Sequence, residues 1–290
     1  IMSGSGHLLS GQTIYLKLRK GETVEDLMIL DTGGKPRGGM KMANGTNSIK
    51  TAPFPGTRGK SAALVREQYI KAQAYQKKLA AAKEDPGKAP ERDLAMEALV
   101  EVLEGKRVVH HHTHRHDDIL TVLRLREEFG FRLVLHHVSE AWKVAPQIAA
   151  AKVPCSIILL DSPGGKLEAR DIEWRNGAEL EKLGVVTSFH TDDPINDSRW
   201  FLRSGGFAVR AGMSRHGALY ALTMAGAVQL DMEERVGSLS AGKDADFIIL
   251  SGDPLSVYSR VEETWIEGKR VFNLADPEDK LFAVGGEGAG

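Results

Sequence analysis

The sequence has a single cysteine, no long apolar run and no excess of charge of either sign. Cys155 cannot form an internal disulfide, and its place in the apolar run 153–160 predicts a buried, unreactive thiol. No stretch approaches the roughly 20 apolar residues that a membrane-spanning helix needs. With 38 basic and 39 acidic residues, the formal net charge of −1 predicts neither nucleic acid nor a membrane as partner. The sequence begins with Ile1-Met2-Ser3-Gly4, which is typical neither of a signal peptide nor of a natural start, so any targeting sequence and the cellular compartment stay open.

The middle of the chain alternates short apolar runs with helical patterns. Strands are expected at residues 107–112, 131–137, 153–160 and 185–190, and helices at 117–128, 140–152, 171–182 and 197–211. Strands that alternate with helices of this length predict right-handed βαβ units and a parallel sheet. With 290 residues, the chain is long enough for one large α/β domain and a small appendage.

The two ends of the chain follow a different pattern. Upstream, strands are expected at 12–18 and 39–43, a loop at 45–59, and helices at 61–82 and 92–104. Downstream, a helix over 215–230 precedes strands at 247–250, 261–266 and 269–272, the last two joined by a Glu267-Gly268 turn. This downstream part predicts a small β-rich appendage, followed by a Gly-rich tail.

Seven of the ten histidines fall in two clusters at the ends of expected strands. The first cluster spans residues 110–116, and the second is His136-His137. Because side chains alternate along a strand, His110, His112 and His114 should share one face, and only one of His136 and His137 should face the interior. Imidazole is a favoured ligand of zinc and similar cations, so the clusters predict a metal site. The alternative is a set of surface or supporting histidines without a metal.

A carboxylate follows the expected strand 185–190, in His190-Thr191-Asp192-Asp193-Pro194. A carboxylate at this position can bind a metal and take a proton from an attacking water. The alternative use is helix capping, by Asp193 or Asp197. Capping is favoured for Asp197 and chemistry for Asp192.

Histidines after two consecutive strands, with an aspartate after a strand two units on, resemble the amidohydrolase superfamily. The segments 223–247 and 265–271 are similar to that superfamily's C-terminal signature. The nearest resemblance within it is to imidazolonepropionase-related amidohydrolases and dipeptidases. It implies an α/β fold, a TIM-like (β/α)8 barrel incomplete at the N-terminus, with a small β-sandwich appendage. The implied division is residues 1–235 for the partial barrel, 236–275 for part of a composite sandwich, and 276–290 for the tail.

The resemblance also implies roles for individual residues. His112 and His137 would be metal ligands, and Asp192 a ligand and general base; Asp192 and His137 are the expected catalytic residues. Lys41 would be a carboxylated lysine that bridges two metals, with a solvated lysine as the open alternative. Besides these, His114, His190 and Lys166 are expected to contact substrate. Lys166 closes the loop 161–166, which is otherwise read as an ordinary turn.

The superfamily's first-strand motif, two histidines separated by one residue, is missing, since His7 is the only histidine before residue 110. Either a longer protein or another polypeptide is therefore expected to complete the barrel; a homo-oligomer is also expected. The leading hypothesis is a metal-dependent hydrolase, with one or two ions, zinc expected, that uses metal-activated water to cleave a C–N bond of an amide, cyclic amide or short peptide. A ring-amidine deaminase is an enzymatic variant. The rival is a non-catalytic binding or structural subunit that keeps the fold with an incomplete metal site.

Overall fold

The larger of two sheets has six strands. The structure is a computed structural model that describes residues 4–159 and 166–285. The strands lie side by side in chain order: β1 (Leu9–Gln12), β2 (Met40–Ala43), β3 (Val109–Thr113), β4 (Leu133–His137), β5 (Cys155–Ile157) and β6 (Thr187–Phe189). Strand β1 is antiparallel to β2, and every later neighbour pair is parallel. The expected α/β class is therefore confirmed, and the arrangement is consistent with a TIM-like fold. Within the two described ranges, β1 and β6 do not pair with each other.

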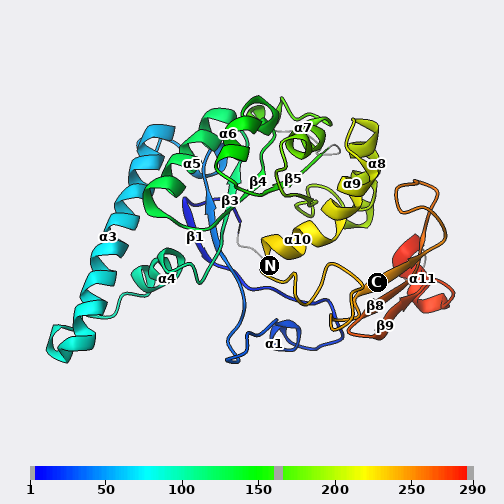
Figure 1. Cartoon of the computed structure of the whole chain (residues 1–290), viewed down its shortest axis with the longest axis horizontal. Helices are drawn as coiled ribbons and strands as arrows, with labels where there is room; N and C mark the ends of the chain where they lie inside the picture. Colours follow the sequence, from blue (N-terminus) through cyan, green and yellow to red (C-terminus); the bar gives the residue numbers. More distant parts are fainter. Residues whose placement is uncertain (1–3, 160–165, 286–290) are drawn as a thin grey trace.

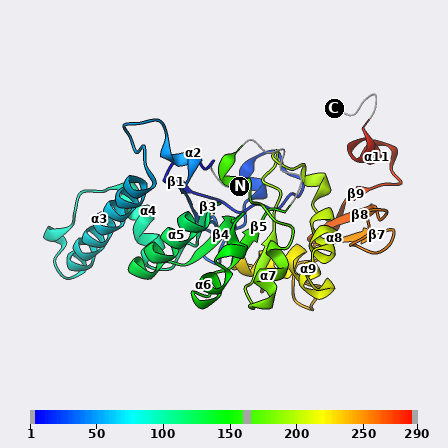
Figure 2. The ribbon, with the colours of Figure 1, turned by 90° about the horizontal axis from the view of Figure 1, so that it is seen from above.

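Helices follow the strands, and Figures 1 and 2 show α5, α6 and α7 side by side along the sheet. The longer helices are α3 (Arg58–Glu84), α4 (Leu94–Leu103), α5 (His116–Phe129), α7 (Asn176–Lys182), α8 (Arg203–Arg210), α9 (Arg215–Leu222) and α11 (Pro277–Val284). The shorter ones are α1 (Val24–Leu27), α2 (Thr46–Ile49), α6 (Ala145–Ala150) and α10 (Met224–Gln229), with 3-10 turns η1 (Pro86–Lys88), η2 (Ala141–Lys143), η3 (Leu167–Ala169) and η4 (Ser198–Trp200). Among them, none combines the length and apolarity that crossing a bilayer requires.

Helix α5 shows why these segments fold as they do. Its first turn carries Asp117 and Asp118, whose charges favour the positive end of the helix dipole. It ends at Gly130, which adopts the left-handed conformation that glycine takes without steric cost. Its apolar stripe faces the core. The helix therefore starts and stops close to where the sequence pattern predicts.

The two faces of the parallel strands differ in chemistry. Most helix-facing positions are apolar and belong to one buried core: Met40, Met42, Val109, Leu133, Leu135, Cys155 and Ile157. Most positions that alternate with them carry polar side chains: Lys41, His110, His112, His136 and Ser156. Burying the first face drives the sheet onto its helices. The second face leaves a buried set of titratable groups available for a site.

Three predicted elements are wrong at the ends of the chain. The expected strand 12–18 is replaced by β1 at Leu9–Gln12. Beyond β1, the backbone of Tyr15 donates to Arg37 and accepts from Ile29, so residues 13–17 divide their hydrogen bonds between two segments. The expected loop 45–59 contains α2 and the first residues of α3. The expected helix 215–230 is broken into α9 and α10 at Thr223, whose φ of −133° and ψ of −90° are not helical.

The second sheet is small and antiparallel, with β7 (Phe247–Leu250), β8 (Val261–Ile266) and β9 (Lys269–Asn273). It lies at the opposite end of the molecule from α3 (Figures 1 and 2). The buried ammonium of Lys17 ties the N-terminal segment to this region through Asp246 at 3.0 Å and Glu267 at 3.4 Å. The strands predicted for the appendage are confirmed, while the domain boundaries stay a prediction.

Candidate functional site

The histidines at the carboxyl ends of β3, β4 and β6 converge. The ring of His112 lies 4.8 Å from that of His114 and 4.5 Å from that of His137, measured between centroids. The ring of His190 lies 4.8 Å from that of His137. Carboxyl ends of parallel strands meet at one edge of a sheet, which is where active sites of such folds lie. The structure thus brings together residues that the sequence separates by up to 78 positions.

Both His136 and His137 reach this cluster, so the expectation that only one could do so is wrong. By alternation, His137 should share the helix-packed face of Leu133 and Leu135. Instead its φ is 69° and that of Val138 is 40°, so the strand ends in left-handed backbone that turns the His137 ring inward. The rings of His136 and His137 lie 5.5 and 4.8 Å from that of His190.

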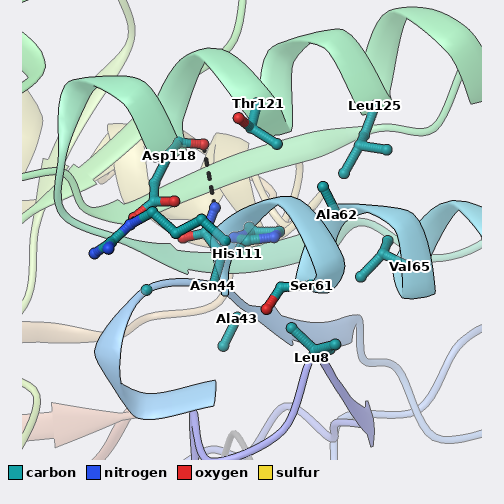
Figure 3. Close-up of a pocket in the computed structure, with 12 residues that line it drawn as sticks. Leu8, Ala43, Asn44, Ser61, Ala62, Val65, His111, Asp118, Thr121 and Leu125 are labelled. Carbon is teal, nitrogen blue, oxygen red and sulfur yellow. Dashed lines mark hydrogen bonds and ion pairs between the residues drawn. The ribbon is translucent and has the colours of Figure 1, made fainter. Parts of the chain in front are cut away.

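His111 lies on the other face of β3, as the alternation predicts. Figure 3 shows its side chain among residues of α3, α5 and the end of β2, with the Asn44 amide donating to the carbonyl of Asp118 at 3.1 Å. The Nδ1 of His111 donates to the carbonyl of His112 at 2.9 Å. His111 is therefore part of the packing behind the site rather than of the site.

Among the residues that the structure describes, three buried potential ligand atoms of the site have no hydrogen-bond partner: His112 Nε2, His114 Nε2 and Glu168 Oε1. Ligand atoms of these three residues all lie within 4.8 Å of one another. The other ring nitrogen of His114 is held by Ser139 Oγ at 2.8 Å, which fixes the ring. Buried polar atoms normally find partners, and two imidazoles with a carboxylate form a zinc-type ligand set. The residues therefore fit a divalent cation.

Sequence reasoning missed Glu168, which lies in η3 after β5. It has no periodic pattern around it, and the only available signal was its place in a loop that follows a predicted strand. Its neighbour Lys166 was singled out instead. The rest of that predicted rim loop, residues 161–165, lies outside the described residues.

Lys41 is buried on β2, so the solvated-lysine alternative is wrong. Only 6% of its surface is exposed. Burial lowers the pKa of its ammonium, the negative charge of Asp192 opposes this shift, and the positive charge of Lys166 adds to it. The charges of Asp192 and Lys166 therefore both act on the ammonium of Lys41.

Asp192 is exposed at the end of β6, with a left-handed φ of 55°. The capping role belongs to Asp197, whose side chain accepts from the backbone N–H of Arg199 at 2.9 Å at the start of η4. This confirms the expected division between the two aspartates as far as capping is concerned. The chemical role of Asp192 stays a prediction.

Burial keeps the imidazoles of the site neutral. Desolvation lowers the pKa of His110 and His114 to about 4 and that of His190 to about 3. The same cause lowers the pKa of His112 and His137. Neutral imidazole is the form that binds metal. Burial also raises the pKa of the Cys155 thiol, as expected for an unreactive cysteine.

His190 supports His137. Its Nε2 is hydrogen-bonded to His137 Nδ1 at 2.9 Å, and its Nδ1 to Ser156 Oγ at 2.9 Å. The hydrogen bond to Nδ1 leaves His137 Nε2 as the ring nitrogen that can face a ligand. The expected contact of His190 with substrate stays a prediction.

The family comparison decides the class of protein. The model of the "Amidohydrolase family" matches residues 103–272, more than half of the chain. The chain belongs to the amidohydrolase family. The expected superfamily membership is thereby confirmed, and the match includes β3 through β8 and most of β9, with all the site histidines.

Related proteins agree with this assignment. The chain is similar to the crystal structure of an amidohydrolase from Thermotoga maritima MSB8, with 35% identity and a TM-score of 0.87, over 94% of this chain and 71% of that one. It is 29% identical over 186 residues to the amidohydrolase tasK of Hapsidospora irregularis, which is 62% of this chain and 19% of tasK. It is 37% identical over 95 residues to adenine deaminase 2 of Shouchella clausii (strain KSM-K16), which is 31% of this chain and 16% of the deaminase. The chain thus matches less than a fifth of the length of each curated relative.

Proposed function

We propose that this amidohydrolase is a metal-dependent hydrolase that cleaves a C–N bond of an amide, a cyclic amide or a short peptide. The observation that carries the proposal is the group of three unpartnered, buried donor atoms of His112, His114 and Glu168. Leaving such atoms without a partner costs about 1–3 kcal/mol each, and a bound cation removes that cost. Family membership supports the hydrolase class.

His112, His114 and Glu168 would hold one divalent cation, with zinc expected. His137, which the resemblance gives as a ligand, stacks on His114 with ring centroids 5.1 Å apart and would join this set through Nε2. Lys41 and Asp192 would serve a second ion if Lys41 is carboxylated. His114, expected from the sequence to contact substrate, is proposed as a ligand because its Nε2 has no partner.

A divalent cation, when bound, supplies positive charge that lowers the pKa of water and polarises a carbonyl. Asp192 would take a proton from the attacking water and pass it to the leaving nitrogen. Its exposed position leaves it accessible to substrate. Lys166, whose positive charge acts on His112 and His114, would attract the electron-rich oxygen of the substrate carbonyl.

The substrate class follows from the chemistry rather than from a shaped pocket. A small molecule with an amide-like C–N bond fits the proposed reaction, and the similarity to an amidohydrolase and to an adenine deaminase supports C–N hydrolysis. Imidazolonepropionase-like specificity and deamination of a ring amidine both remain within this proposal. A panel of amides, cyclic amides and dipeptides separates them.

The test is the substitution Asp192→Asn, assayed on that panel with elemental analysis of the protein. We expect turnover to fall at least about 1,000-fold while bound zinc is largely retained, because the amide cannot accept the proton. Asp197→Asn is the matched control, since asparagine still caps η4. Near-normal turnover in Asp192→Asn would remove its assignment as the base. A wild-type chain with neither metal nor turnover would instead favour a non-catalytic binding subunit.

A further inference from the structure

The carboxylate of Glu168 is held from one side only. Its Oε2 accepts from the backbone N–H of Thr46 at 2.7 Å and lies 3.6 Å from a terminal nitrogen of Arg58. Its Oε1 has no hydrogen-bond partner within residues 4–159 and 166–285, and it belongs to the group with His112 and His114. One oxygen is therefore occupied by the protein, while the other is left for the site.

Arg58 joins this carboxylate to a second buried one. Its Nε donates to Asp118 Oδ2 at 2.8 Å. The side chains of Asp118 and Glu168 are only 4% and 2% exposed, so neither charge has much solvent to stabilise it. The planar guanidinium can serve both carboxylates at once, which a single point charge cannot do with the same geometry.

Gly45 leaves room for this arrangement. Its φ is 77°, and a Cβ added there would lie 2.4 Å from Glu168 Oε2. The stretch from the end of β2 to the first residue of α3 thus supplies three features that hold Glu168: the space at Gly45, the N–H of Thr46 and the positive charge of Arg58. None of these residues is among the candidate ligands.

We propose that Arg58 is a positioning residue that holds the Glu168 side chain with Oε1 directed at His112 and His114. The proposal rests on the proposed function, because it gives Glu168 the role of ligand. Arg58 acts through Glu168 and does not itself contact the bound cation. Asp118 anchors the far side of the guanidinium.

The test measures Zn2+ affinity of the whole chain by competition with a chelator, and the visible spectrum of the Co2+ form. Arg58→Gln is expected to weaken Zn2+ binding about 10- to 100-fold, as loss of an outer partner of a ligand typically does. Arg58→Lys keeps the positive charge but lacks the planar guanidinium. Its Zn2+ affinity should therefore lie between those of wild type and Arg58→Gln. Both should change the Co2+ spectrum, because the ligand field changes.

A control separates positioning from simple loss of structure. Arg66→Gln breaks an exposed ion pair between the same two helices, Arg66 Nε to Glu128 Oε2 at 2.7 Å. This variant should bind Zn2+ within about threefold of wild type, since exposed charge pairs contribute little. Asp118→Asn removes the anchor on the other side of the guanidinium and is expected to weaken Zn2+ binding by less than Arg58→Gln does, because Arg58 keeps its contact with Glu168.

A double variant completes the test. If Arg58 acts through Glu168, then adding Arg58→Gln to Glu168→Gln produces no further loss of Zn2+ affinity. Equal losses in both backgrounds, or an Arg58→Gln protein that binds Zn2+ as tightly as wild type, overturn the positioning role. A wild-type chain that binds no Zn2+ is a different result, since it overturns the proposed function and leaves Arg58 with no ligand to position.

Discussion

Two groups of buried histidines lie on the same strands and differ in one respect. In the Tyr15–His110–His136 chain, His110 uses both ring nitrogens, Nε2 with Tyr15 Oη at 2.9 Å and Nδ1 with His136 Nε2 at 3.0 Å. In the His112–His114–Glu168 cluster, each imidazole keeps one nitrogen that no described residue contacts by a hydrogen bond.

Neither residue type nor burial distinguishes the two groups. His110 and His112 are two positions apart on one face of β3, and both are almost fully buried. The difference lies in the residue that a distant segment contributes. Tyr15 gives His110 a hydrogen-bond partner, whereas Glu168 adds a further potential ligand beside His112 and His114. A satisfied imidazole stabilises the fold, whereas an unsatisfied one needs something to bind.

Acid should lower the stability of the metal-free chain through both groups of histidines, and this is the largest effect expected. The pKa of His110 and His114 is about 4 when folded, against about 6.5 for unfolded histidine, so the unfolded chain takes up protons first as the pH falls. Stability of the metal-free chain is therefore full above about pH 6.5 and falls towards pH 4. The loss is about 1.4 kcal/mol per pH unit for each such histidine. Urea unfolding in the presence of a chelator measures it, and a flat profile between pH 7 and 5 would contradict the buried, neutral state.

Zn2+ affinity should distinguish residues of the His112–His114–Glu168 cluster from the other buried histidines. His112→Ala is expected to weaken Zn2+ binding more than about 100-fold, because a ligand is lost. His111→Ala, one position away on the helix-facing side, should leave Zn2+ affinity nearly unchanged while it lowers stability. Chelator competition gives the affinities. Comparable losses in both variants would mean that the unpartnered nitrogens do not mark the site.

Tyr15→Phe tests the satisfied group alone. The phenol is lost and a nitrogen of His110 stays buried without its partner, at a cost of about 1–3 kcal/mol in the free energy of unfolding. Zn2+ affinity is expected to stay within about twofold, since His110 is not a ligand. Urea unfolding and chelator competition on the same preparation check both parts. A large change in Zn2+ affinity would instead connect the two groups.

Ser139→Ala should lower Zn2+ affinity less than His112→Ala does. It removes the partner of His114 Nδ1, so the ring loses its fixed orientation but keeps Nε2. Zn2+ affinity should fall about tenfold, the lower end of what loss of an outer partner causes. Ser139→Thr, which retains a hydroxyl, should restore part of that affinity. No difference between alanine and threonine would argue against an orienting role for the hydroxyl.

The sequence was sufficient for the features that depend on local pattern. Apolar runs predict β3 to β6 because strands that are buried against helices need apolar side chains. The predicted ends of β3 and β4 then indicate that His112 and His137 lie close together. The cap at Asp197 was predictable because capping uses neighbouring residues. Features that depend on distant contacts could not be predicted in this way. Tyr15 meets His110 across 95 positions, and Glu168 meets its histidines from a loop without periodicity.

The left-handed turn at His137 and Val138 has a consequence for protein engineering. Non-glycine residues, and valine above all, disfavour this backbone by about 1–2 kcal/mol, so a screen for thermostability alone would select glycine or asparagine at residue 137. Either replacement would relax the backbone and remove an imidazole from the site. At residue 137, thermal stability and function therefore favour different residues.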